Sequence, residues 1–80
     1  MQLNKNELRR LADALEKLEA HTIYSQGWKQ LSGAWAKAEM FDYDEDIIDV
    51  ELKFGIQDGE QDVQYTETLK INRKTMEVID

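Results

Sequence analysis

The residues with the most evident chemical potential lie between Asp42 and Glu51. Six carboxylates fall within these ten residues, and no lysine or arginine lies among them. Carboxylates this close together can bind a cation, supply the acid and base of a hydrolase, or attract a basic protein. Aromatic rings beside carboxylates suit a surface that docks on arginine or lysine. We therefore predict partner binding by eight residues of this acidic segment (residues 41–51): Phe41, Asp42, Tyr43, Asp44, Glu45, Asp46, Asp49 and Glu51.

The first alternative for the acidic segment is a calcium site. Asp42, Asp44 and Asp46 have the alternating spacing of the ligands that open an EF-hand loop. The sixth position of that loop should be glycine but is Ile47, and the twelfth should be a bidentate glutamate but is Lys53. Lys53 thus places a positive charge where a calcium ion would need a carboxylate. We therefore expect no specific metal site and no cofactor.

The second alternative is catalysis. His21 is the only histidine, and Ser25 and Ser32 are the only serines, so a Ser-His-Asp arrangement is possible by count. No nucleophile-elbow or glycine-rich motif accompanies them. A zinc site would have to be completed by carboxylates alone, since the chain has no cysteine. Paired hydrolase carboxylates need a cleft that separates their pKa values. An enzyme is therefore the third-ranked function.

The distribution of charge favours a basic protein as the partner. Residues 1–38 hold six Lys and Arg against four Asp and Glu, whereas residues 39–67 hold eleven Asp and Glu and only Lys53. A field of this sign repels nucleic acid and anionic lipid and attracts cations. We expect an inhibitor or antagonist that occupies the basic surface of a nucleic-acid enzyme, without binding nucleic acid itself. The plain alternative is a charged loop that serves solubility.

Compartment and membrane contact are constrained by what the sequence lacks. The absence of cysteine fits the reducing cytoplasm. The first residues have no apolar stretch of the signal-peptide kind, and no run of 18 apolar residues could span a bilayer. We predict a cytoplasmic protein with no membrane contact.

The first half of the chain is expected to be helical, from about residue 4 to 38. Asn4 and Glu7 have the spacing of a capping box, and leucines recur at helical intervals up to Leu18, which predicts a helix over residues 4–20. Trp28, Leu31, Trp35 and Ala38 also have helical spacing and predict a second helix over residues 25–38, with both tryptophans in the core. The rival is a strand that begins near Ala34.

The second half, residues 47–80, is expected to form a sheet. Apolar and polar residues alternate strictly from Ile48 to Ile56, which is typical of a strand with one buried face. Asp58-Gly59 predicts a type I′ hairpin turn that pairs Gln57 with Glu60. That register sets three apolar pairs on the core face and one exception, Glu67 opposite Val50, for which we expect a bulge near Thr66. The apolar pairs are Leu52 with Tyr65, Phe54 with Val63, and Ile48 with Leu69.

A last strand is expected after a turn at residues 72–75, with Ile71 opposite Met76 and Leu69 opposite Val78. The 80 residues then form one α+β domain, in which one or two N-terminal helices pack on a three- or four-stranded antiparallel β-meander. The exposed edge of the terminal strand, Met76 to Ile79, suggests the second-ranked function, a structural module that self-associates as a homodimer.

Overall fold

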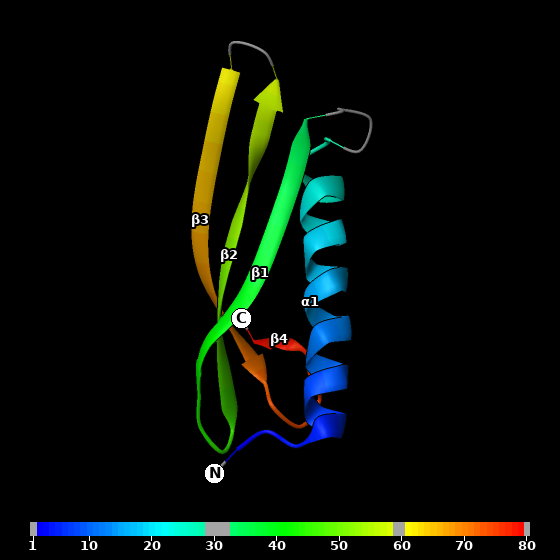
Figure 1. Cartoon of the computed structure of the whole chain (residues 1–80), viewed down its shortest axis with the longest axis vertical. Helices are drawn as coiled ribbons and strands as arrows, with labels where there is room; N and C mark the ends of the chain where they lie inside the picture. The colour runs from blue at the N-terminus through cyan, green and yellow to red at the C-terminus, as the bar shows by residue number, and fades with distance from the viewer. Residues whose placement is uncertain (1, 29–32, 59–60, 80) are drawn as a thin grey trace.

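The computed structural model describes residues 2–28, 33–58 and 61–79. One helix, α1 (Lys5–Ser25), precedes an antiparallel sheet whose strands lie in chain order (Figure 1). The predicted α+β meander is thus confirmed, with one helix and four strands. The strands are β1 (Ala34–Tyr43), β2 (Ile47–Asp58), β3 (Gln61–Asn72) and β4 (Val78–Ile79).

Local signals in the sequence fix both ends of α1. The predicted capping box is confirmed, because the Glu7 backbone N–H donates to the Asn4 side chain at 2.8 Å and the Asn4 N–H donates to Glu7 Oε1 at 3.2 Å. The helix continues to Ser25, five residues beyond the predicted end. It stops before Gly27, whose φ of 75° is the left-handed conformation that glycine adopts without a steric penalty.

The second helix predicted over residues 25–38 is wrong. α1 ends at Ser25, residues 29–32 lie outside the described residues, and β1 begins at Ala34, as the rival reading proposed. Pairing with β2 decides the outcome, since Ala38 lies opposite Leu52 and both are buried. Helical spacing of a few residues is a weak preference that such tertiary contacts override.

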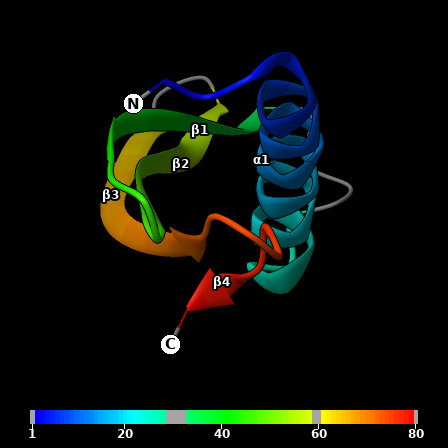
Figure 2. The ribbon, with the colours of Figure 1, turned by 90° about the horizontal axis from the view of Figure 1, so that it is seen from below.

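The sheet curls into a half-barrel around α1 (Figure 2). The helix packs mainly against β1, and it lies in the open side of the curl between β1 and β4. Glu19 Oε2 of the helix accepts a hydrogen bond from the Ala38 N–H at 2.7 Å, which occupies a backbone donor of β1. Among the described residues, seven apolar side chains form the buried core: Leu11, Ala38, Ile48, Val50, Leu52, Phe54 and Ile71.

The predicted pairing of β2 with β3 is wrong by two residues. Phe54 lies opposite Tyr65 rather than Val63, and Leu52 opposite Glu67 rather than Tyr65. The pair nearest the turn is Asp58 with Gln61, so the hairpin turns one residue later than expected. Because side chains alternate with period two, a shift of two residues keeps each side chain on its predicted face.

That shift also leads to further corrections. Gln57 lies opposite Asp62, and Glu60 lies outside the described residues. Ile48 lies opposite Ile71 rather than Leu69. On the last strand, Ile71 lies opposite Val78 instead of Met76, because the turn is longer than four residues and the Asn72 N–H bonds the carbonyl of Glu77 at 2.8 Å.

The bulge expected near Thr66 is also wrong, because the β2–β3 register runs through it without interruption. The irregularity lies between Met40 and Asp42 of β1 instead. Glu67 is exposed although it shares a sheet face with the core. Since α1 packs on β1 and touches β2, the β3 side of that face is left open and the carboxylate keeps its water.

Gly55 permits the curl of the sheet where β2 and β3 approach closely. A Cβ added at Gly55 would overlap the carbonyl oxygen of Val63 and lie 3.1 Å from the Cα of Gln64. Gly55→Ala should therefore lower the free energy of unfolding by about 1–3 kcal/mol, measured by urea denaturation. Gly27→Asn is the control, because asparagine tolerates positive φ and nothing lies within 4 Å of that position. An undiminished stability of the alanine variant would contradict the close approach.

Candidate functional site

The acidic segment forms the hairpin between β1 and β2. Its turn depends on Asp44, whose Oδ1 accepts hydrogen bonds from the backbone N–H groups of Asp46 and Ile47, each at 2.8 Å. The Asp44 N–H in turn donates to the Ile47 carbonyl at 2.9 Å. These two backbone donors lower the pKa of the Asp44 carboxyl below its ordinary value. Asp44 is therefore a structural residue of the turn.

Arg73 holds this turn against the start of α1. Its side chain is only 7% exposed, and its Nη1 donates to the Asp44 carbonyl at 2.8 Å. Its Nε donates to Glu7 Oε2 at 2.6 Å and its Nη2 to Glu7 Oε1 at 3.2 Å, a bidentate pair. The Arg73 N–H also bonds the carbonyl of Asp46 at 2.9 Å. One buried cation thus joins three segments that are far apart in the sequence.

Tyr43 belongs to this structural cluster as well. It is half-buried against the core, and the Arg73 guanidinium lies 5.8 Å from the centre of its ring. A cation at that distance is attracted by the ring face. Of the eight residues predicted to bind a partner, Tyr43 and Asp44 are therefore occupied within the fold.

The other carboxylates gather on the outer face of the sheet. Asp42 lies opposite Asp49, and in the neighbouring row Glu39 lies opposite Glu51. The alternation of the strands puts all four on the face turned away from the core. We call these four residues the acidic face. Glu39 was missed by the sequence reasoning because it lies outside the acidic segment, two residues before Phe41, and only the β1–β2 pairing brings it beside Glu51.

Phe41, Glu45 and Asp46 flank the acidic face. Phe41 lies in the register shift of β1 and is 59% exposed. Glu45 and Asp46 are exposed at the turn. The sheet thus presents one aromatic ring next to six carboxylates from two strands and their turn.

Nearby lysines offset part of this negative charge. Lys70 Nζ lies 2.9 Å from Asp49 Oδ1, and Lys37 Nζ lies 2.9 Å from Glu39 Oε1. The Lys37 ammonium lowers the pKa of the Glu39 carboxyl. The pKa values of the Glu7, Glu39 and Asp44 carboxyls are all lowered by their hydrogen-bond donors. A general acid would need the opposite shift.

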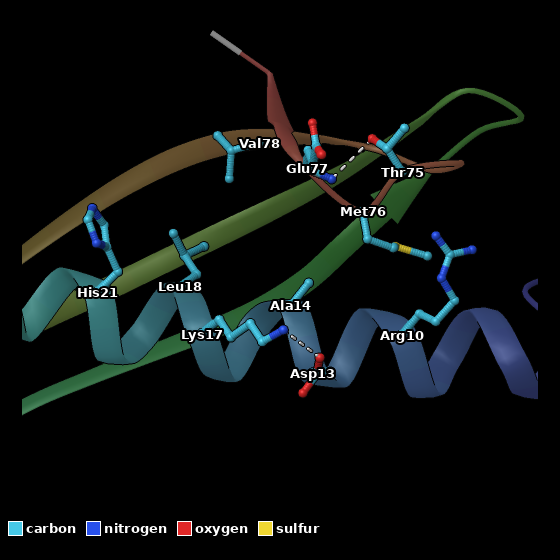
Figure 3. Close-up of a pocket in the computed structure, with 10 residues that line it drawn as sticks. All are labelled: Arg10, Asp13, Ala14, Lys17, Leu18, His21, Thr75, Met76, Glu77 and Val78. Carbon is cyan, nitrogen blue, oxygen red and sulfur yellow. Dashed lines mark hydrogen bonds and ion pairs between the residues drawn. The ribbon is translucent and has the colours of Figure 1, made fainter.

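A groove of about 500 Å³ lies on the other side of the molecule, between α1 and residues 75–78 (Figure 3). Thr75 Oγ1 accepts a hydrogen bond from the Glu77 N–H at 3.3 Å, and His21 lies at the opposite end of the groove. A hydroxyl and an imidazole this far separated do not form a nucleophile and base. Within the described residues, no three His, Asp or Glu side chains are grouped to hold a metal ion.

Comparison with known proteins does not identify a relative. No family model, curated protein or solved structure matches the chain. In the described part of the chain, no helix is long and apolar enough to cross a membrane. The functional assignment therefore depends on the acidic face itself.

We predict that Asp44 and Asp42 differ sharply in how much their carboxylates contribute to stability. Asp44→Ala should lower the Tm by roughly 4–8 °C, because two backbone N–H groups lose their acceptor. Asp42→Asn should leave the Tm unchanged or raise it, because it keeps the side-chain oxygen that accepts from the Tyr43 N–H at 2.8 Å and removes one of two like charges placed opposite each other. Thermal denaturation by circular dichroism measures both. Equal effects of the two changes would contradict the turn geometry.

The Glu7–Arg73 pair predicts a specific pH dependence. Glu7 accepts hydrogen bonds from Arg73 and from the Asn4 N–H, and these lower the pKa of its carboxyl below the ordinary value of 4.5. The stability that this pair contributes is therefore complete above pH 4.5 and is lost as the pH falls through the lowered pKa. Wild type should therefore have a higher Tm than Glu7→Gln at pH 7, and the difference should shrink below pH 4.5. Glu16→Gln, on the exposed side of α1, is the matched control and should follow wild type throughout. A Tm difference between wild type and Glu7→Gln that is independent of pH would contradict the pair.

Proposed function

We propose that this protein is a cytoplasmic binding module that docks its acidic face on a basic surface of a partner protein. The partner in this proposal is a nucleic-acid-binding protein or enzyme, which the chain inhibits or antagonises by occupying the surface that would otherwise hold phosphates. Neither catalysis nor direct binding of nucleic acid is part of the proposed activity.

The observation that carries the proposal is the pairing of like charges across β1 and β2. Asp42 faces Asp49 and Glu39 faces Glu51 in adjacent rows. Like charges directly opposite each other destabilise a sheet, so folding alone does not favour this arrangement. A cationic partner would relieve the repulsion, and complementary fields would speed the encounter.

The spacing of the carboxylates indicates which kind of basic surface fits. Neighbours on the acidic face are about 4.8 Å apart across the strands and about 7 Å apart along them. Duplex DNA carries one charge per ~1.7 Å of its axis, which is denser. A compact cluster of arginine and lysine therefore fits the acidic face better than a long phosphate channel. Phe41 beside the face supplies a ring on which an arginine can stack.

The first test measures binding of a fluorescein-labelled ten-residue oligoarginine peptide by fluorescence anisotropy. The variant Asp42→Asn, Asp49→Asn, Glu51→Gln should bind at least tenfold more weakly than wild type at 50 mM salt, mainly through slower association. The matched control, Asp13→Asn, Glu16→Gln, Asp62→Asn, has the same net charge of −4 (−7 + 3) but should bind within about twofold of wild type. Equal weakening of both variants would reduce the effect to net charge and contradict the proposal.

The second test addresses the partner. The immobilised wild type and both triple variants are exposed to a lysate of the source organism, and bound proteins are eluted with duplex DNA. We expect the wild type and the control variant to capture nucleic-acid-binding proteins that duplex DNA then releases. The acidic-face variant should not capture these proteins. A partner that all three retain equally, and that neither salt nor DNA releases, would overturn the phosphate-mimic function.

A further inference from the structure

The outer edge of β3 is open along most of its length. β2 pairs with β3 from Gln61 to Asn72, but on the other side β4 pairs only with Lys70 and Ile71. The Asn72 N–H donates toward the β4 side, to the carbonyl of Glu77. Since backbone groups alternate between the two edges of a strand, the same edge carries the N–H and C=O groups of four further residues. These are Asp62, Gln64, Thr66 and Thr68, all exposed.

This edge lacks the protection that the opposite edge of the sheet has. On β1, the Ala38 N–H is occupied by Glu19 and the strand is covered by α1. Between residues 61 and 69, β3 contains neither proline nor lysine, which commonly block an edge, and its only charged residues are Asp62 and Glu67. It has apolar side chains on the core face instead, Val63 at 36% and Tyr65 at 50% exposure. Tyr65 stacks on Phe54 with ring centres 5.4 Å apart, which fixes it in place.

We propose that a second copy of this chain pairs with this edge, β3 against β3, in an antiparallel arrangement whose two-fold axis passes at Gln64. This register sets Val63 of each copy opposite Tyr65 of the other, so the two exposed apolar side chains cover each other. Aromatic and β-branched residues are favourable cross-strand neighbours. On the polar face, Asp62 of each copy lies opposite Thr66 of the other, and the two Gln64 residues face each other.

Other registers fit less well. An axis at Tyr65 would set Val63 opposite the carboxylate of Glu67. An axis at Thr66 would carry the pairing to Lys70, where the edge is already taken by Ile79 of β4. A shift by a single residue would place the core face of one copy beside the polar face of the other. The pattern of side chains therefore favours the axis at Gln64.

In the register with its axis at Gln64, Asp62 of one copy lies opposite Thr66 of the other and Glu67 lies opposite Gln61, so no two carboxylates of the edge face each other. The acidic face lies toward the β1–β2 turn and extends to Glu51, which pairs with Thr68, whereas residues 62–66 pair with residues 53–57 nearer the other end of the sheet (Figure 1). The site also differs from the terminal strand Met76 to Ile79 that the sequence suggested for self-association, because β4 has only two residues.

The first experiment is sedimentation equilibrium of the full chain between 10 and 500 µM. One strand pair is a small interface, so we expect a reversible dimer with a Kd on the order of 10–100 µM. Gln64→Pro removes an outward N–H without removing a bond to β2, and should give a monomer whose circular dichroism matches wild type. Gln64→Thr is the matched control and should still dimerise. A wild type that is monomeric at 500 µM would overturn the proposal and leave the edge to a strand of another protein.

The second experiment tests the register, and the lack of native cysteine makes it clean. Directly opposite residues of a hydrogen-bonded pair have Cα atoms about 5.5 Å apart, within the range of a disulfide. Gln64→Cys should therefore form a disulfide-linked dimer under mild oxidation, whereas Thr66→Cys and Thr68→Cys should not. Cross-linking through Thr66→Cys in preference to Gln64→Cys would overturn the proposed axis. The acidic-face variant should dimerise like wild type, which separates this inference from the proposed function.

Discussion

The buried guanidinium of Arg73 is the interaction on which the arrangement of this fold depends. It joins the capping box of α1, the β1–β2 turn and the turn after β3 through hydrogen bonds to Glu7 and to the carbonyl of Asp44. A buried cation is costly unless it is paired and its remaining donors are satisfied. Here Glu7 accepts two of its bonds and backbone carbonyls accept others. The same side chain thus fixes the end of the molecule from which the acidic face is displayed.

The acidic face shows a conflict between folding and charge placement. On the outer face, three neighbouring pairs of β1 and β2 join like charges: Lys37 with Lys53, Glu39 with Glu51, and Asp42 with Asp49. Each strand relieves this locally, since Lys37 pairs with Glu39 and Lys53 lies 3.4 Å from Glu51. Exposed pairs of this kind contribute little, so the bands of one sign persist on the surface. Such bands suit recognition better than they suit stability.

The two edges of the sheet differ because only one of them is covered. α1 shields the β1 edge, whereas β4, with only two residues, covers only a small part of the β3 edge. The helix therefore buries the β1 and β2 side of the core face and leaves the side chains of Val63, Tyr65 and Glu67 exposed. The acidic face and the open edge are consequently separate surfaces, and one chain can use both at once.

The sequence by itself determined the elements whose signals are local. The capping box placed the start of α1, and strict alternation from Ile48 to Ile56 identified β2 and its buried face. Local pattern also assigned each side chain of β3 to its correct face, although the pairing was wrong by two residues. A shift of two residues leaves the period-two alternation of a strand unchanged, so the alternation cannot reveal it. The register is set instead by the residue at which the chain turns, and moving the turn by one residue shifts the pairing by two.

Only the tertiary structure decided the features that depend on distant contacts. Residues 34–38 could be read as helix or strand, and pairing with β2 selected the strand. Glu39 joins the acidic face only through its position opposite Glu51. Tyr43 leaves the predicted binding set because Arg73, some thirty residues further along the chain, lies over its ring. Local spacing reports which residues can share a face, whereas burial and cross-strand contact arise from segments that the sequence keeps apart.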